Sequence, residues 1–229
     1  AALLDEHPRE YAAVILAHGG EEPTDDFLAR VRDLAHRHGA VFIWDEIVTG
    51  LRWPPGGAQA RYGVTPDLAC FGKALGNGLP ISAVVGGRAL MQEFERVFVS
   101  MTFGGDVLAL AAARVVLDEV VSCRVVEHLW EVGTLWMDGM RGAIAGTGVD
   151  VTLVGAPPRS ALTFADQGGQ SAAHVRSLFL QECVKRGVLF GAPIFMSYSH
   201  LAPDIADTLA VARDALAEVA TALRTGTLA

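Results

Sequence analysis

The chain has 229 residues, of which 51% are hydrophobic and 19% charged, a composition typical of globular domains and not of disordered chains. Its 18 basic and 26 acidic residues give a net charge of −8, and without a basic block we expect no nucleic-acid partner. No apolar run approaches the roughly 18 residues that a membrane-spanning helix needs, so we expect no membrane partner either.

Three cysteines, Cys70, Cys123 and Cys183, are widely spaced and form no CxxC pattern. An odd number of cysteines without metal-site or disulfide spacing is typical of buried thiols in a reducing compartment. The cysteine pattern therefore predicts a cytoplasmic protein.

The first part of the chain predicts a strand, a helix and a second strand. Residues 11–17 and 41–44 are continuous apolar runs, as expected of strands buried on both faces. Between them, apolar residues recur at helical spacing after a polar N-cap cluster at residues 23–26 and before Gly39. This βαβ unit predicts a parallel sheet.

The remaining elements divide into two groups. The first group contains a Pro/Gly-rich irregular segment at residues 51–66, strands at 68–71, 81–86 and 97–100, and helices at 88–94, 106–119 and 123–142. The second group predicts strands at 149–154, 160–164 and within 188–198, and helices at 171–186 and 203–223. We place a domain boundary near residue 120, inside the long helical region, so that residues 1–120 form one unit and the helix at 123–142 belongs to an α+β unit at 121–229.

Asp45 and Lys73 follow two neighbouring predicted strands. Open parallel sheets bind ligands at the carboxyl ends of their strands, so both side chains should face one crevice. A partly desolvated carboxylate needs a cationic or donor partner, and a protonated ring nitrogen would serve. Lys73 is the only lysine in the first 184 residues, and an amine packed between small residues and Phe71 can lose its proton and form an imine.

Each of these two residues also has a structural interpretation. Asp45 alone could be an N-cap or an ion-pair partner, and Lys73 alone a surface lysine at a helix start. Their order on successive βα units favours a cofactor site. Thr102, with Gly104 and Gly105 before a helix, adds a possible anion site, although the same pattern is common in loops and Asp106 would repel a phosphate if it pointed inward.

Four segments carry a family resemblance: residues 45–50 (DEIVTG), 57–68, 72–80 (GKALGNGLP) and 101–105 (MTFGG), followed by Ser197-Tyr198-Ser199-His200 near the end. Together they resemble the class III pyridoxal-phosphate-dependent aminotransferases, specifically the glutamate-1-semialdehyde aminomutase-like branch. The resemblance implies the fold-type I architecture: a mostly parallel sheet in a large cofactor domain, here its C-terminal part, and a small α+β C-terminal domain.

The resemblance also implies roles for four residues. Lys73 would form the Schiff base with pyridoxal 5'-phosphate, Asp45 would pair with the ring nitrogen, and Ile47 would pack on one ring face. Thr102 would bind the cofactor phosphate of the neighbouring protomer in a homodimer. The implied reaction transfers an amino group between a small-molecule amino donor and a carbonyl acceptor.

The family's enzymes are longer than this chain, so the resemblance implies that the phosphate cradle and a ring-stacking aromatic belong to an N-terminal half in the same or another chain. The same cofactor residues also serve aminomutases, racemases and decarboxylases. A non-catalytic fragment or subunit is the alternative from another class.

Other residues have simpler interpretations. We expect a structural role for His200 and packing roles for Trp44 and Trp53. Arg159 could meet a substrate carboxylate, although an arginine beside prolines is also a common surface feature.

Overall fold

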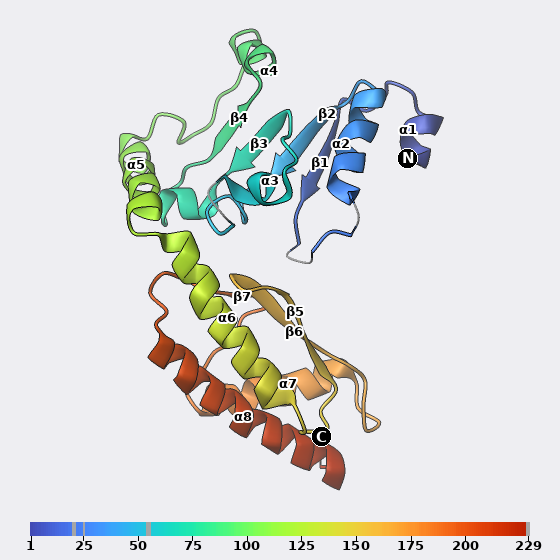
Figure 1. The fold of residues 1–229 in the computed structure, drawn as a ribbon, viewed down its shortest axis with the longest axis vertical. Coiled ribbons are helices and arrows are strands. Elements are labelled where there is room, and N and C mark those ends of the chain that lie inside the picture. Colours follow the sequence, from blue (N-terminus) through green and yellow to red (C-terminus); the bar gives the residue numbers. More distant parts are fainter. Residues whose placement is uncertain (20–21, 25, 54–55, 228–229) are drawn as a thin grey trace. The chain divides into compact units, whose positions relative to one another are not determined.

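The computed structural model describes residues 1–19, 22–24, 26–53 and 56–227 (Figure 1). Asp25 of the predicted N-cap cluster and Pro54-Pro55 of the predicted irregular segment lie outside these residues. The chain forms two compact units, the first made of Ala1–Gly19 and Pro23–Glu127 and the second beginning at His128. None of the described helices is both long and apolar enough to cross a membrane.

A four-stranded sheet organises the first unit, with its strands in the order β1-β2-β3-β4. β1 (Ala13–Ala17), β2 (Val41–Asp45) and β3 (Leu68–Phe71) run parallel, as the sequence predicts, while β4 (Ala83–Gly86) pairs antiparallel with β3. The helix between β1 and β2 is α2 (Phe27–Arg37), which makes the predicted βαβ unit. The sheet is therefore mixed, and its parallel part carries the candidate site.

Short helices and one long helix complete this unit. They are α1 (Ala2–Glu6), α3 (Gly57–Tyr62), the 3₁₀ segments η1 (Lys73–Gly76) and η2 (Glu93–Glu95), α4 (Arg88–Gln92) and α5 (Val107–Ser122). The predicted helix at residues 88–94 is thus divided into α4 and η2.

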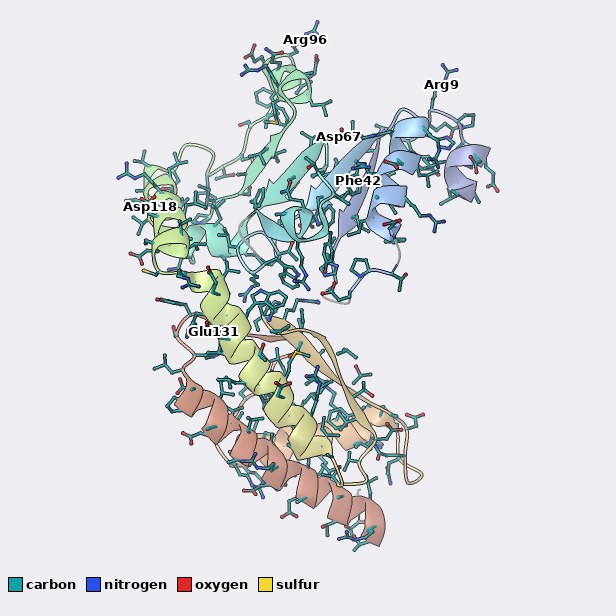
Figure 2. All side chains as sticks on the ribbon, in the orientation of Figure 1. Arg9, Phe42, Asp67, Arg96, Asp118 and Glu131 are labelled. Atoms are coloured by element: carbon teal, nitrogen blue, oxygen red, sulfur yellow. The ribbon has the colours of Figure 1, made fainter. Side chains whose placement is uncertain are left out.

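One face of the sheet carries the core of this unit. Phe42 and Trp44 of β2 are fully buried and pack with Leu28 and Ala35 of α2. A polar contact borders this core, because the Phe42 N–H donates to Asp67 Oδ2 at 2.7 Å (Figure 2). The same carboxylate oxygen lies 2.8 Å from His36 Nε2, so Asp67 joins the end of α2 to the start of β3.

The opposite face of the sheet is open to solvent in the described residues. Ile15, Ile43 and Leu68 are aligned across three strands, and Ile15 is 62% exposed. The prediction that the first strands are buried on both faces is therefore wrong for Ile15, while Ile43 is half-buried. Their apolar sequence suits a two-sided core, but the described residues provide a covering layer on one side only.

The strand predicted at residues 97–100 is also wrong. This segment has no strand structure, and Phe98 is 95% exposed. Its β-branched and aromatic residues fit a strand, but a strand also needs a neighbour to pair its backbone groups. The following helix α5 exposes Val107, Leu108 and Val121 as well, so apolar surface continues along the chain.

The second unit combines an antiparallel sheet with helices, the α+β arrangement that the sequence predicts. Its strands β5 (Val151–Ala156), β6 (Arg159–Phe164) and β7 (Ile194–Phe195) pair in that order. Its helices are α6 (Val125–Ile144), α7 (Ala172–Lys185) and α8 (Ala202–Thr225), with α6 beginning just before the unit itself. Only residues 194–195 of the predicted strand region 188–198 form a strand.

The three thiols are free, but they differ in burial. Cys183 is buried, Cys70 is half-buried and Cys123 is exposed, so the expectation of buried thiols is wrong for Cys123. Burial raises the pKa of the Cys183 thiol to about 12.

A charged cluster lies at the end of α7. The Glu182 carboxylate accepts from Lys185 Nζ at 2.6 Å and from Arg186 Nη1 at 2.6 Å. These two hydrogen bonds, the Lys185 bond contributing most, lower the pKa of Glu182 from 4.5 to about 2. Because the folded-state pKa is depressed, the stabilisation is present above pH 4.5 and is lost as the pH falls through about 2.

The variant Glu182→Gln tests this linkage. We expect it to be less stable than the wild type at pH 7, with a difference in unfolding free energy that narrows steadily from pH 4.5 towards pH 2. Denaturant titrations at several pH values, followed by tryptophan fluorescence, measure the difference. Asp138→Asn removes an exposed ion pair to Arg141 and should change stability by at most about 1 kcal/mol; a pH-independent Glu182→Gln difference would contradict the assignment.

Candidate active site

Asp45 is the last residue of β2 and stands in register with Cys70 of β3. Side chains in register on neighbouring strands point to the same face of a sheet, here the open face. Asp45 is half-buried, and its Oδ1 accepts from the Ile47 N–H at 2.9 Å. Among the described residues it forms no ion pair, so this carboxylate has capacity for a cationic partner.

The electrostatics of Cys70 report the same arrangement. Burial raises the pKa of the Cys70 thiol, and the negative charge of Asp45 raises it further. The carboxylate therefore acts on the end of β3, the strand that leads into Lys73.

Lys73 begins η1, two residues after β3 ends at Phe71. Its backbone is left-handed, with φ 49°, a conformation that costs a non-glycine residue roughly 1–2 kcal/mol. The side chain is exposed, so the prediction that it packs between small residues and Phe71 is wrong in this chain.

Ile47 lies beside the turn that carries Lys73. A Cβ built on Gly72 would stand 3.7 Å from the Ile47 side chain, so the two segments are in close contact. The structure therefore brings Asp45, Ile47 and the Lys73 turn to the carboxyl ends of two adjacent parallel strands.

Thr102 lies elsewhere in the same unit. It is exposed and lines a pocket of about 450 Å³ together with Pro80, Ser82 and Asp106. The residues around this pocket do not include Asp45, Ile47 or Lys73. Three of the four predicted site residues are thus clustered, and Thr102 is not part of that cluster.

Asp106 accepts hydrogen bonds from backbone amides at the start of α5, the helix start considered as an anion site together with Thr102. Its Oδ1 accepts from the N–H groups of Leu108 at 2.9 Å and Ala109 at 3.2 Å, which makes it the N-cap of α5. The amides of Leu108 and Ala109 therefore have a carboxylate partner already, which weakens the interpretation of this helix start as an anion site.

The prediction did not single out Glu46, the residue after Asp45. Glu46 is 1% exposed, and its carboxylate accepts from the Ala58 N–H at 3.0 Å, the Gln59 N–H at 2.9 Å and the Thr49 hydroxyl. The available signal was an acidic residue at a strand end, followed by the Gly-Gly start of a short helix. Its two amide partners are 12 and 13 residues away, a separation that no periodic pattern reveals.

The remaining candidates lie in the second unit or in the core. His200 Nδ1 accepts from the Ser197 N–H at 3.2 Å, and its carbonyl oxygen lies 2.8 Å from His128 Nε2, which agrees with a structural role. The guanidinium of Arg159 lies over the Phe195 ring, 5.9 Å from the centroid. Trp44 and Trp53 are fully buried, which confirms their packing roles.

The mixed sheet and the additional α+β unit define a fold-type I transferase fold, seen here in part. Residues 2–145 match the family model for class-III aminotransferases. The chain therefore belongs to the class-III aminotransferase family.

Named relatives agree with this assignment. The chain is 33% identical to a glutamate-1-semialdehyde 2,1-aminomutase of Roseiflexus castenholzii, covering 98% of this chain and 56% of the relative. It is 31% identical to a 3-aminobutyryl-CoA aminotransferase of Cloacimonas acidaminovorans, covering 95% and 55%. The FumI protein of Sphingopyxis sp. MTA144, solved in its PLP internal aldimine form, has a TM-score of 0.88 at 23% identity over 100% of this chain and 57% of FumI. The chain thus spans about half the length of these relatives.

The variant Asp106→Asn tests the electrostatics of the Thr102 pocket. Asparagine caps helices as well as aspartate does, so the fold should persist while a negative charge next to the pocket disappears. We expect inorganic phosphate to bind several-fold more tightly to the variant, measured by titration calorimetry. Asp118→Asn on α5 makes the same change of net charge outside this pocket; an equal gain in both variants would contradict a local effect.

Proposed function

We propose that this chain is the C-terminal portion of a pyridoxal-phosphate-dependent aminotransferase, which moves an amino group between a small-molecule amino donor and a carbonyl acceptor. The observation that carries the proposal is the position of Asp45 and the Lys73 turn on adjacent parallel strands, in a chain of the class-III family. Residues 1–120 would belong to the large cofactor domain and residues 121–229 would form the small domain. The rest of the site would come from further residues in the same or another polypeptide.

The residues at the strand ends suit this cofactor. Asp45 is a half-buried carboxylate without an ion pair among the described residues, and it would keep a pyridine nitrogen protonated and hold it. Ile47, in contact with the Lys73 turn, would support one face of the ring. The exposed Lys73 amine would hold the aldehyde carbon covalently.

When bound, pyridoxal phosphate supplies an electron sink that stabilises negative charge at the substrate carbon. The protein's part of the chemistry would fall on the two ionisable groups. Lys73 Nζ would act as base and acid for the proton at the substrate Cα. Asp45 would preserve the ring's positive charge during that transfer.

We further propose a homodimer in the cytoplasm. Thr102 would contact the cofactor phosphate of the neighbouring protomer, as the family resemblance implies. The exposed apolar residues Phe98, Phe103 and Leu108 support a role in association for this part of the chain, since monomers seldom expose such large apolar patches. Three free cysteines are compatible with a reducing compartment.

An aminomutase is the second candidate, because three curated relatives are named glutamate-1-semialdehyde 2,1-aminomutase, whereas another is named an aminotransferase. The two reactions differ in where the amino group ends. With a ¹⁵N-labelled amino donor, an aminotransferase passes the label to a separate carbonyl acceptor. An aminomutase produces an isomer of its own substrate without a second acceptor.

Covalent trapping at Lys73 tests the proposed function. The chain has two lysines, Lys73 and Lys185, so Lys185→Ala is a matched control for Lys73→Ala. After incubation with pyridoxal phosphate and reduction by borohydride, peptide mass spectrometry should find the cofactor on Lys73 in the wild type and in Lys185→Ala. The Lys73→Ala variant should carry at least ten-fold less covalently bound cofactor than the wild type.

The trapping experiment should be run on the natural polypeptide that contains these residues. No label in the wild type, or equal labelling of Lys73, Lys185 and the N-terminal amine, would overturn the proposal. The first of these outcomes would favour a non-catalytic module.

A further inference from the structure

Glu46 is a buried carboxylate next to the proposed cofactor residue Asp45. Its side chain accepts three hydrogen bonds, two from the first amides of α3 and one from the Thr49 hydroxyl. Three donors around one carboxylate hold it in place. Glu46 therefore connects the end of β2 to a helix that lies 12 residues further along the chain.

The fit around this carboxylate is close. Gly57, with φ 77°, approaches so nearly that a Cβ built on it would stand 2.6 Å from the Glu46 carboxyl atoms. Any larger residue there would displace the carboxylate or the start of α3. The absence of a side chain at Gly57 therefore leaves the space that the Glu46 carboxylate fills.

The backbone of Glu46 is held as firmly as its side chain. Its N–H donates to the Cys70 carbonyl at 2.9 Å, and its carbonyl accepts from the Gly50 N–H at 2.8 Å. The first bond extends the pairing of β2 with β3 by one residue, beyond the Asp45–Cys70 register pair. Glu46 is consequently fixed to β3, to its own turn and to α3.

This anchoring acts directly on Asp45. Asp45 precedes Glu46, and the only hydrogen bond described for its carboxylate comes from Ile47, the residue after Glu46. Glu46 lies between the acceptor residue Asp45 and the donor residue Ile47, so the position of its backbone determines the geometry of that hydrogen bond. A shift of Glu46 would change the direction of the Asp45 carboxylate relative to Cys70 and the Lys73 turn.

We infer that Glu46 is a positioning residue, whose buried carboxylate holds Asp45 in the direction in which it would meet the protonated ring nitrogen of the cofactor. The contact between Asp45 and the cofactor rests on the proposed function. The claim that Glu46 holds the Asp45 carboxylate in place does not need the cofactor and is tested separately.

Cys70 provides a readout that a purely structural role for Glu46 would not change. Asp45 is the charged group that acts on this thiol, and its charge raises the thiol's pKa. In a Cys123→Ser background the accessible thiol is Cys70, because Cys183 is fully buried. The pH dependence of Cys70 alkylation by iodoacetamide, followed by peptide mass spectrometry, reports how close the Asp45 carboxylate lies.

We expect Asp45→Asn to move the alkylation midpoint to lower pH, since the negative charge is removed. Glu46→Gln should move it in the same direction by at least half as much, because Asp45 is no longer held near the thiol. The double variant should show no further shift than Asp45→Asn alone, the non-additivity expected of residues that act through one another. Glu182→Gln, which alters a buried carboxylate in the second unit, should leave the midpoint unchanged.

An unchanged midpoint in a folded Glu46→Gln protein would overturn the inference, as would additive shifts in the double variant. If circular dichroism shows that Glu46→Gln does not fold, Thr49→Val replaces it. Thr49→Val removes one of the three donors and should lower the midpoint by a smaller amount; an unchanged midpoint in this variant would equally overturn the inference.

A second arm uses the cofactor. If the proposed function holds, Asp45→Asn and Glu46→Gln should each weaken pyridoxal phosphate binding, again without additivity, in a titration followed by absorbance. A wild type that traps no cofactor at Lys73 would overturn the proposed function, while the alkylation midpoints would still decide the role of Glu46. A wild type that traps cofactor, together with unshifted midpoints, would overturn the inference alone.

Discussion

The parallel pairing of β2 with β3 is the constraint on which the candidate site depends. Asp45 and Cys70 stand opposite each other in that pairing, and the Glu46 N–H adds one more bond to Cys70. A slip of one residue would turn Asp45 to the opposite face of the sheet, against α2 and α3, where an unpaired carboxylate would be costly. The burial of apolar side chains on one face therefore fixes the β2–β3 register, and this register places Asp45 on the other face.

The buried face explains why this register is stable. Phe42 and Trp44 alternate with Ile43 and Asp45 along β2, and only the first pair is fully buried. Shifting the strand would expose two large aromatic side chains, each of which contributes a few kcal/mol when buried. The placement of Asp45 is thus secured largely by residues that never contact a ligand.

The parts of the fold that local patterns encode could be predicted from the sequence. The βαβ unit, the strand at 68–71 and the helices of the second unit follow from periodicity, and Asp45 and Lys73 follow from the rule that ligands bind at strand ends. Burial could not be predicted in the same way. Ile15 and Phe98 have sequences suited to a core, but their exposure depends on whether other residues cover them.

The hydrogen-bond partners of the carboxylates escaped prediction for a different reason. Glu46 bonds amides 12 and 13 residues away, and Asp106 turns back onto the helix that it begins. A carboxylate has several possible partners, and only the folded backbone selects among them. The sequence could therefore name the acidic residues near the site without telling which would face a ligand and which would face the protein's own amides.

Two carboxylates, Glu46 and Asp106, accept hydrogen bonds from amides at helix starts. The Glu46 carboxylate accepts hydrogen bonds from the amides of α3, whereas its neighbour Asp45 faces the open side of the sheet. The Asp106 carboxylate accepts hydrogen bonds from the amides of α5, and its negative charge weakens the electrostatic attraction between this helix start and an anion beside Thr102. Helix amides can satisfy either a protein carboxylate or an incoming phosphate, and in the described residues both helix starts are committed to the first. Under the proposed function, the cofactor phosphate would find most of its hydrogen bonds in residues other than these amides.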